Sequence, residues 1–405
     1  MSIAQLRQRL RDLGAKPCHE DRLLRGWSQV CSYDRAHSAA EGFFPLALRN
    51  ELPAIEAELN GLAQLRSEYP ANGHGLNTAE GANVALRASS NNEGVARLLV
   101  ELADGQMVES VLLPRGGLCV STQVGCAVGC VFCMSGRDGL QRQLGSAEIV
   151  AQVVLARRRR AVCKVVFMGM GEPAHNLDNV LEAIQLLGTQ GNIGHKNLVL
   201  STVGDLRVFE RLMEGLTQPH SPIPPLTPPL KGGERHSLPA SHPPFQGEGW
   251  GGDGLIPANG QSRFFQTVKP ALALSLHTTD ATLRARLLPH APQIAVEELV
   301  ERAEVYARAT SYPVQYQWTL MEGINDSDAE VERIAQLLSG KYAIMNFIPF
   351  NEIDGLDYRR PSAERTAYMV GALHRHGILA RIRDSAGQEI EGACGQLRVR
   401  AVKAA

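Results

Sequence analysis

The sequence predicts an α/β fold in which parallel strands and crossover helices form a closed or partly closed barrel, after a small helical domain and a β-hairpin. Three observations predict this fold. Apolar residues recur at helical spacing near the N-terminus, at Leu6, Leu10 and Leu13. The pair Asp104-Gly105 separates two alternating segments, and from Cys119 onward buried strand patterns alternate with amphipathic helix patterns.

The composition is that of a globular protein. The chain has 405 residues, of which 44% are hydrophobic and 20% charged, with a formal net charge of -1. This balance gives no excess charge that would by itself indicate a nucleic-acid partner, so any such surface must be local. Residues 1–17 form an Arg-rich amphipathic pattern without the apolar centre of a signal peptide, and no apolar run reaches spanning length. We therefore expect a cytoplasmic protein without a membrane segment.

Residues 1–90 are expected to form a helical N-terminal domain. The segments 1–17, 19–29 and 44–65 carry its helical patterns. Residues 91–118 are expected to form a β-hairpin linker, because an Asp-Gly pair between alternating apolar segments is the strongest short-range hairpin signal.

Residues 119–400 are expected to form the barrel, because parallel strands need crossover connections of helical length. Its strand patterns are residues 164–170, 197–203, 270–277, 314–321, 342–350 and 379–383. Its helix patterns are residues 177–188, 205–214, 281–288, 295–308, 328–338 and 363–377.

One stretch interrupts this alternation. Residues 217–262 contain nearly half of the 22 prolines and many glycines. Ordering a backbone costs about 1–2 kcal/mol per residue, and this segment has little apolar surface to offset that cost. We interpret it as a disordered Pro/Gly-rich insertion; a proline-motif docking segment is the functional alternative.

Polar residues follow several of the predicted strands directly. In barrels of parallel strands the chemistry lies at the carboxyl ends of the strands, so these positions are candidates for a site. They are Gly171-Glu172, Ser201-Thr202, Ser275-Leu276-His277 and Asn351.

Four of the eight cysteines lie within residues 119–133, and the last three, Cys126, Cys130 and Cys133, are spaced C-x3-C-x2-C. Eight cysteines are too sparse for a disulfide scaffold in a chain of this length. Buried free thiols, a structural zinc site with Cys119 as fourth ligand, and an iron-sulfur cluster all remain possible on spacing alone. In a [4Fe-4S] cluster, three thiolates would leave one iron open to chelate the amino and carboxylate groups of S-adenosylmethionine (SAM).

The cysteine segment, with Phe132 before its last cysteine, resembles the signature of radical SAM enzymes. Further motifs resemble the RlmN/Cfr type of radical SAM RNA adenine methyltransferases, and the similarity spans about residues 5–400 outside the insertion. These motifs are residues 118–126, 165–173, 272–277, 325–330, 347–351 and 391–397.

The resemblance implies a fold and a set of cofactors. The fold is the partial (β/α)6 TIM-like barrel of the radical SAM type, and Cys126, Cys130 and Cys133 are the ligands of a [4Fe-4S] cluster. Two molecules of SAM are used per turnover: one methylates a cysteine of the enzyme, and the other yields a 5′-deoxyadenosyl radical. A radical route suits an electron-poor adenine carbon, which the electrophilic methyl group of SAM would not attack by a polar path.

The resemblance also implies three catalytic residues. Cys394, within Ala393-Cys394-Gly395-Gln396, matches the methyl carrier. Cys119 matches the thiol that resolves the enzyme-RNA adduct by forming a disulfide with the carrier. Glu109 matches the general base, although a solvated strand glutamate would be the commoner reading of such a residue from spacing alone.

SAM is expected to contact residues at the strand ends. The resemblance assigns the methionine end of SAM to Gly171 and Glu172, and its other contacts to Ser201, Ser275, Leu276, His277 and Asn351. The remaining cysteines in the first part of the chain, Cys18, Cys31 and Cys163, match no motif position and are interpreted as structural.

The resemblance makes RNA the expected partner. Arginines in the N-terminal helices, at Arg359-Arg360 and at positions 381, 383, 398 and 400 could contact phosphates. The run Arg157 to Arg160 is better interpreted as a solvated helix face. Because the target base must reach a buried radical, it should be flipped out of its stack or already unstacked.

The predicted reaction is methylation of an adenine carbon, C2 first, in 23S ribosomal RNA, with tRNA as a second candidate substrate. The expected electron donor is a flavodoxin or ferredoxin. Methylation at C8 or of another RNA is the alternative within the family. A noncatalytic iron-sulfur or zinc protein that binds RNA is the alternative from another class, and it would have no use for Cys394 and Cys119.

Overall fold

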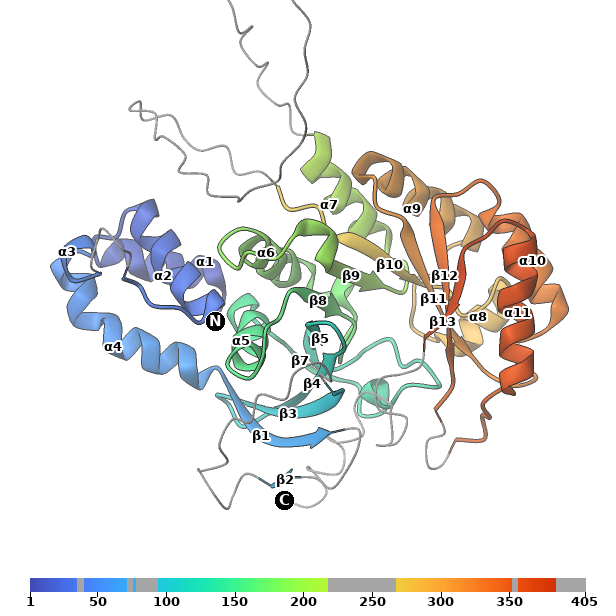
Figure 1. Cartoon of the computed structure of the whole chain (residues 1–405), viewed down its shortest axis with the longest axis horizontal. Helices are drawn as coiled ribbons and strands as arrows, with labels where there is room; N and C mark the ends of the chain where they lie inside the picture. The colour runs from blue at the N-terminus through green and yellow to red at the C-terminus, as the bar shows by residue number, and fades with distance from the viewer. Residues whose placement is uncertain (35–39, 71–75, 78–93, 218–266, 352–355, 384–405) are drawn as a thin grey trace, which may run out of the picture.

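The structure is a computed structural model that describes residues 1–34, 40–70, 76–77, 94–217, 267–351 and 356–383. Within these ranges the chain forms one sheet of eleven strands in the order β13-β12-β11-β10-β9-β8-β5-β4-β3-β1-β2, and a separate pair, β6-β7 (Figure 1). Helices lie along the outside of the long sheet. The predicted α/β class and its partial barrel are confirmed.

The N-terminal domain begins with helices that bury one apolar face. Ser2 and Gln5 form a reciprocal capping box at the first of them, which fixes where that helix starts. Its Leu6 and Leu10 are fully buried, as their spacing predicts. The helices of this part are α1 (Ile3–Asp12), α2 (Pro17–Gln29), α3 (Ala40–Phe43) and α4 (Leu46–Gly61).

The structure differs from the helical prediction after residue 61. Strand β1 (Ala63–Pro70) leaves helix α4 directly and pairs antiparallel with β3 (Ala96–Leu102), and a short β2 (Leu76–Asn77) pairs with β1. The predicted helix pattern ran through Leu65 without a break. Pairing with an existing strand outweighs local helical propensity here, because it gives the backbone hydrogen-bond partners at the sheet edge.

The predicted hairpin is present. Strands β3 and β4 (Met107–Leu113) pair antiparallel around Asp104-Gly105, and Gly105 has a positive φ of 79°. The next strand, β5 (Gly117–Cys119), pairs antiparallel with β4 and parallel with β8 (Lys164–Phe167). The hairpin therefore leads directly into the parallel part of the sheet.

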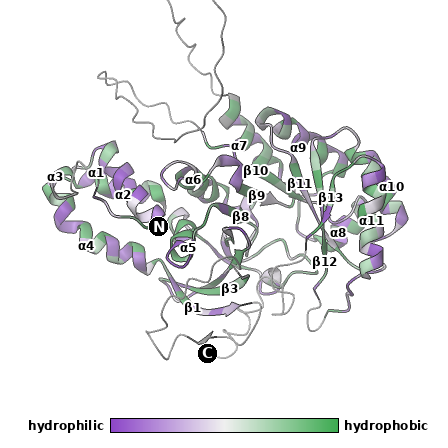
Figure 2. Cartoon of the chain, in the orientation of Figure 1, coloured by the Kyte–Doolittle hydropathy of each residue, from purple (hydrophilic) through white to green (hydrophobic). Residues whose placement is uncertain are grey.

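From β5 onward, neighbouring strands of the long sheet are parallel. They are β8, β9 (Leu198–Thr202), β10 (Ala271–Ser275), β11 (Val314–Leu320), β12 (Ala343–Pro349) and β13 (Ala380–Ile382). The separate pair is β6 (Gln123–Gly125) and β7 (Leu140–Gln143). The central strands are strongly apolar, whereas the surrounding helices carry both apolar and polar residues (Figure 2).

Helices connect the parallel strands and cover the outer face of the sheet. The α-helices of this part are α5 (Ser146–Arg157), α6 (Leu177–Gly188), α7 (Leu206–Thr217), α8 (Ala281–Leu287), α9 (Val296–Thr310), α10 (Asp328–Leu338) and α11 (Ala363–Arg375). Three short 3-10 helices are described: η1 (Met134–Gly136), η2 (Pro173–Asn176) and η3 (His195–Asn197). In the part of the chain that the structure describes, no helix combines the length and apolarity needed to cross a bilayer.

The two faces of the parallel strands have different surroundings. Leu274, Tyr316 and Phe347 belong to the main core together with residues of the surrounding helices. Val199 and Ala273 belong instead to a separate small apolar cluster. Because side chains alternate along a strand, the first set defines the outer face and the second set the inner face of the partial barrel.

The N-terminal domain packs against helices α5 and α6, and we call this contact the docking interface. The backbone N–H of Ile3 donates to Ser146 Oγ at 2.8 Å and to Glu182 Oε2 at 3.1 Å. From helix α2, Gln29 Nε2 donates to the carbonyl oxygen of Gln190 at 2.5 Å.

Arg157 is part of this interface, so the solvated helix face predicted for Arg157 to Arg160 is wrong for this residue. Its guanidinium donates to the carbonyl oxygens of Ser28 at 2.6 Å, Gly191 at 2.8 Å and Val162 at 3.1 Å. Burial lowers its pKa. Arg157 therefore joins helix α2 to the barrel.

The rest of the run also contacts the protein itself. Arg158 binds the Asn60 side chain, Arg159 binds Glu68, and Arg160 donates to the carbonyl oxygen of Gly117 at 3.3 Å. These contacts hold the end of helix α5 against helix α4 and the antiparallel strands.

The boundaries 1–90, 91–118 and 119–400 remain predictions. Most of the insertion predicted at 217–262 lies outside the described residues, as do Cys394, Arg398 and Arg400. Residue 217 itself ends helix α7.

Candidate active site

The candidate site lies at the carboxyl ends of the parallel strands, where the cysteine segment crosses the sheet. That segment connects β6 to β7 and contains Cys126, Cys130 and Cys133, followed by helix η1. Its backbone is fixed from two sides. Cys126 N–H donates to the carbonyl oxygen of Gly139 at 3.1 Å, and Val131 N–H donates to that of Leu287 at 3.1 Å.

Apolar residues surround the cysteine segment. Val128, Leu288, Met321 and Phe350 are buried in a small core of their own, and Cys126 and Cys130 pack against it. An apolar wall therefore borders one side of the cysteine segment, which suits a cofactor whose chemistry must be shielded from water.

The three thiols are crowded. Burial and then the neighbouring thiols Cys133 and Cys126 raise the pKa of Cys130 well above its usual range. Burial raises the pKa of Cys126 to about 12, and Cys133 and Glu172 act in the same direction. Three thiolates in such a place need a cationic partner, which the irons of a cluster would supply.

Within the described ranges, no three His, Cys, Asp or Glu side chains converge on the position of a single metal ion. A four-iron cube makes a different demand, because each thiolate ligates an iron of its own. The eight-residue segment from Cys126 to Cys133 supplies three thiols, one for each of three irons, so the donor set fits the cluster.

Gly171 and Glu172 follow strand β8, where the sequence predicts the methionine end of SAM. Gly171 has φ +100°, and a Cβ there would lie 2.6 Å from the Gln123 side chain, so no other residue fits without strain. The Glu172 N–H donates to Gln123 Oε1 at 2.8 Å. Gln123, three residues before the first cluster ligand, thus fixes this turn to the cysteine segment.

The Glu172 carboxyl group joins the ends of β8 and β9. It is 5% exposed and accepts hydrogen bonds from the N–H groups of Ala174 at 3.2 Å and Val203 at 3.1 Å. Burial raises its pKa to about 7, although the hydrogen bond from Thr202 opposes this shift. A buried acid of this kind can bind an ammonium group without leaving a permanent unpaired charge in its absence.

Val203 contributes to the site through its backbone. Its N–H binds Glu172, and its carbonyl oxygen accepts from the buried guanidinium of Arg284. The end of β9 is therefore joined to both of these side chains.

His277 is locked in place behind strand β10. It is 6% exposed, its backbone has a left-handed φ of 64°, and its Nδ1 accepts from the Thr319 N–H at 2.9 Å. Burial lowers its pKa to about 3, with Arg284 adding to the shift, so the ring is neutral with its proton on Nε2. The ring contacts Phe132 with a centroid separation of 4.7 Å. The structure thus brings Phe132 of the cysteine motif onto a residue that the sequence predicts for SAM.

Arg284 is a functional candidate that the sequence reasoning missed. It is 4% exposed, and its Nε has no hydrogen-bond partner in the described chain. Burial lowers its pKa to about 10, while Cys130 and Glu172 act in the opposite direction. Its position on α8 after a predicted SAM residue was a signal, but arginines on amphipathic helices are usually solvated.

The other residues predicted for SAM lie at or near the same end of the sheet. Ser201 is on β9 and Ser275 is the last residue of β10, both on the inner face, while Leu276 is fully buried. Asn351 follows β12 and is half-buried. All of these strand ends belong to the parallel part of the sheet.

Cys119 lies on the inner face of β5 as a free thiol that is 8% exposed. Burial raises its pKa to about 11, while the Met168 backbone N–H and the Arg383 guanidinium act in the opposite direction. Arg383 is the last described residue before the segment that contains Cys394. The chain therefore enters that segment near Cys119.

Glu109 is not a solvated glutamate. It is 1% exposed, and its Oε2 lies 2.5 Å from Nη2 of Arg97, which is equally buried. Because Val111 pairs with Cys119, and Glu109 is two residues before Val111, Glu109 and Cys119 project from the same face of neighbouring strands.

A buried hydrogen-bond network, also missed from the sequence, holds these strands together. The Gln152 side chain accepts from the Ser121 N–H at 2.9 Å and donates to the Ser121 carbonyl at 2.9 Å. Ser121 Oγ in turn donates to the carbonyl oxygen of Glu109 at 2.6 Å and accepts from the Met170 N–H at 2.9 Å. Ser121 thus ties the strand of Glu109, the segment after Cys119 and the turn before Gly171 to one point.

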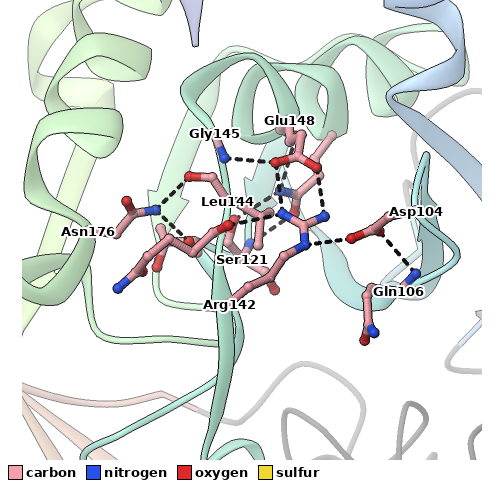
Figure 3. Close-up of polar contacts among 11 residues, drawn as sticks. Asp104, Gln106, Ser121, Arg142, Leu144, Gly145, Glu148 and Asn176 are labelled. Atoms are coloured by element: carbon pink, nitrogen blue, oxygen red, sulfur yellow. Dashed lines mark hydrogen bonds and ion pairs between the residues drawn. The ribbon is translucent and has the colours of Figure 1, made fainter. Parts of the chain in front are cut away.

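Arg142 fixes the strand that leaves the cysteine segment (Figure 3). Its Nε lies 2.6 Å from Asp104 Oδ2 in the hairpin turn, and its Nη2 lies 2.8 Å from Glu148 Oε1 on helix α5. Nearby, Asn176 Nδ2 donates to the carbonyl oxygen of Leu144 at 2.7 Å. The hairpin is therefore fastened to the frame of the site.

A parallel partial barrel with a half-buried three-cysteine loop at its mouth defines the class, that of the radical SAM enzymes. Comparison with known proteins agrees, since the model of the Radical SAM superfamily matches residues 120–223. The chain is similar along its whole length to a crystal structure of a radical SAM methyltransferase from Sphaerobacter thermophilus. The TM-score is 0.67 with 28% identity, covering 98% of this chain and 97% of the other.

Close relatives narrow the family. The chain is 57% identical to a probable RNA methyltransferase of Azoarcus sp. strain BH72, covering 100% of this chain and 96% of the relative. It is 55% identical to a probable RNA methyltransferase of Pseudomonas aeruginosa PAO1, with the same coverage. The chain belongs to the radical SAM RNA methyltransferases.

Proposed function

We propose that this protein methylates C2 of an adenine in 23S ribosomal RNA, with tRNA as a second substrate, through a methyl group carried on Cys394. Cys119 resolves the enzyme-RNA adduct, and Glu109 is the general base. The expected electron donor is a flavodoxin or ferredoxin, and two SAM molecules are used per turnover.

The observation that carries the proposal is the placement of Cys119 and Glu109 on one face of neighbouring strands. A resolving thiol and a base must act on the same adduct, so they have to face the same space. Both side chains are almost fully buried there, which a noncatalytic RNA-binding protein would not require. The buried Arg97 keeps the Glu109 carboxyl group in a fixed orientation.

Two groups of residues would hold the two cofactors. Cys126, Cys130 and Cys133 would hold the [4Fe-4S] cluster, and Gly171, Glu172, Ser201, Ser275 to His277 and Asn351 would hold SAM. When bound, these cofactors supply the methyl group and the radical chemistry.

The resolving step follows from thiol chemistry. The Cys119 thiolate attacks the sulfur of Cys394, a disulfide forms, and the bond from that sulfur to the transferred carbon breaks; the electron pair stays on that carbon, which takes up a proton and becomes the methyl group. Glu109 takes the proton from the adenine carbon. With a pKa of about 11, Cys119 is protonated at neutral pH, so it must lose its proton before it attacks; Arg383 favours that loss.

The direct test is nucleoside mass spectrometry. Ribosomal RNA and tRNA from cells lacking the gene should lack one 2-methyladenosine, and reconstituted enzyme should restore it. An 8-methyladenosine in its place would support the alternative position within the family. An unchanged set of methyladenosines would contradict the proposal.

Two variants test the residue roles. Cys119→Ala should stall turnover and accumulate a covalent enzyme-RNA species, visible as a shifted band under denaturing conditions. Cys394→Ala should abolish methyl transfer while leaving the formation of 5′-deoxyadenosine possible. Free methylated RNA from Cys119→Ala, or normal methylation by Cys394→Ala, would contradict these roles.

A further inference from the structure

A row of polar side chains crosses the inner face of the barrel at the level where β10 ends. Strand register places Ser275 beside Gln317, Gln317 beside Asn346, and Asn346 beside Arg381, on four adjacent parallel strands. We call these four residues the polar row. Only Ser275 of the row belongs to the residues predicted for SAM.

The register also fixes the face. Ser275 alternates with Leu274, which packs against the outer helices, and Gln317 alternates with Tyr316 and Trp318, which do the same. The polar row therefore continues the inner face defined by Ala273.

Two atoms of the row are buried without a partner. Gln317 and Asn346 are 1% and 3% exposed. Gln317 Nε2 donates to the carbonyl oxygen of Gln315 at 3.2 Å, but across the described ranges neither Gln317 Oε1 nor Asn346 Nδ2 has a hydrogen-bond partner. Buried polar groups in proteins are nearly always paired, so an unpaired acceptor beside an unpaired donor points to a ligand.

The unpaired Gln317 Oε1 and Asn346 Nδ2 indicate what kind of ligand fits this place. An acceptor and a donor on neighbouring strands, about 4.8 Å apart at the backbone, match the edge of adenine, which offers an amino donor beside a ring-nitrogen acceptor. Guanine offers two acceptors at the corresponding edge and would leave Gln317 Oε1 facing another oxygen.

The row ends in positive charge at the edge of the sheet. Arg381 is exposed on β13, the edge strand of the described sheet. Lys164 lies on the inner side of β8, where burial lowers its pKa and Arg383 and Arg381 lower it further, so these cations are gathered in one place. Such a cluster attracts a phosphate group.

We propose that Gln317 and Asn346 read the base to be methylated, with Gln317 Oε1 accepting from the adenine amino group, Asn346 Nδ2 donating to a ring nitrogen, and Arg381 binding a backbone phosphate. This specificity site rests on the proposed function, because it takes adenine as the methylated base. It adds Gln317 and Asn346, which none of the motifs singled out.

The adenine of SAM has the same edge, so the source of the ring must be decided. Asn351, predicted for SAM, lies beyond the end of β12 at Pro349, whereas Asn346 lies within the strand and therefore deeper in the barrel. The row also leads away from Ser275 toward the exposed Arg381, which suits a nucleotide attached to a longer chain. Both observations favour the RNA base.

The test exchanges amide for acid at each position. Gln317→Glu keeps an acceptor for the adenine amino group but loses the donor to the Gln315 carbonyl oxygen, so RNA methylation should fall, though clearly less than in Asn346→Asp. Asn346→Asp replaces the donor by an acceptor that faces a ring nitrogen, so methylation should fall roughly 10- to 100-fold. Asn346→Leu, which also removes the donor, should show a similar loss.

The assay uses reconstituted holoenzyme and protein-free ribosomal RNA and tRNA from cells lacking the gene, with methyladenosines quantified by mass spectrometry. Equilibrium SAM binding is measured in parallel and should change less than twofold in each variant. Gln336→Glu, the same exchange at an exposed position of α10, is the matched control and should match the wild type in both assays.

The outcomes are distinct. Equal losses from Gln317→Glu and Asn346→Asp would indicate a merely structural role and overturn the inference, as would unimpaired methylation by Asn346→Asp and Asn346→Leu. A loss of SAM affinity that matches the loss of methylation would assign the pair to SAM and also overturn it. Methylation of a base other than adenine by the wild type would overturn this inference and the proposed function together.

Discussion

Two arginines, the half-buried Arg157 and the buried Arg284, show how the docking interface differs from the barrel mouth. Arg157 at the docking interface donates to three backbone carbonyl oxygens, within 2.6–3.1 Å. Arg284 at the mouth binds the carbonyl oxygen of Val203, but its Nε is unpartnered among the described residues while thiols and a carboxyl group lie nearby. The Arg157 guanidinium therefore binds the protein itself, whereas the Arg284 guanidinium keeps an N–H group that could bind a ligand.

The same contrast holds beyond these two residues. Thr122 Oγ1, Gln317 Oε1 and Asn346 Nδ2 are also buried without partners in the described part of the barrel. The described N-terminal domain has two such atoms as well, Trp27 Nε1 and Arg49 Nε, but they are not part of a row of polar groups. We therefore propose the clustered unsatisfied atoms of the barrel, rather than the isolated ones, as ligand-binding groups.

The largest expected effect is a complete loss of function at the barrel mouth with no change at the docking interface. Cys130→Ala removes one of three thiolates at the mouth, so iron binding and RNA methylation should be lost, while the docking interface should remain folded. Iron content, methylation and the urea unfolding midpoint measure these three outcomes. Cys163→Ala, at an exposed cysteine outside the motif, should retain iron and activity. Full methylation by Cys130→Ala would contradict the expected difference between the barrel mouth and the docking interface.

A smaller effect is expected where the frame of the site is held together. Gln152→Leu leaves the Ser121 N–H and carbonyl and the Ser110 hydroxyl without their buried partner, which should lower the free energy of unfolding by about 3 kcal/mol. Urea denaturation measures it. Gln336→Leu on the exposed face of α10 is the control and should change stability by less than about 0.5 kcal/mol. An equal effect of both variants would show that the network contributes nothing.

At the docking interface, Arg157→Met should lower the free energy of unfolding by about 2 kcal/mol, because buried carbonyl oxygens lose a charged donor. SAM affinity should stay the same, which would show that the docking interface and the barrel mouth act independently. Arg158→Met, at an exposed neighbour in the same run, should change stability by less than about 0.5 kcal/mol. A change in SAM affinity with Arg157→Met would show that the regions are coupled.

The last expected effect concerns pH at the mouth. Burial raises the pKa of Cys119 to about 11, so its thiolate fraction rises about tenfold for each unit from pH 7 to pH 9. Release of RNA from the adduct, measured in single-turnover experiments, should accelerate accordingly. Arg383→Gln removes a charge that favours the thiolate and should slow release at every pH in this range. A rate of release independent of pH would argue against Cys119 as the resolving thiol.

The sequence predicted the parts of the fold in which local pattern and tertiary structure agree. The pattern over 177–188 became helix α6 and that over 328–338 became helix α10, both with the same bounds. The hairpin at Asp104-Gly105 formed because turn chemistry and strand alternation favoured the same structure. Strand β1 was missed because a neighbouring strand, rather than its own sequence, determines its conformation.

For the site, residues carried by a motif could be predicted, whereas residues identified only by their contacts could not. Gln152 and Arg284 look like ordinary helix residues in sequence, because nothing local shows that a helix position is fully buried. Arg157 was misjudged for the same reason: a run of arginines normally favours water, and two of its three carbonyl partners, Ser28 and Gly191, come from distant segments.

The left-handed backbone of His277 has a consequence for protein engineering. Glycine or asparagine would relieve the strain at φ 64°, so a laboratory search for heat resistance should select them at this position. Either would discard the imidazole that contacts Phe132 and holds the Thr319 N–H. Thermotolerant clones altered at this codon should therefore be poor enzymes, and an unfavourable torsion angle here is a reason to leave the residue alone.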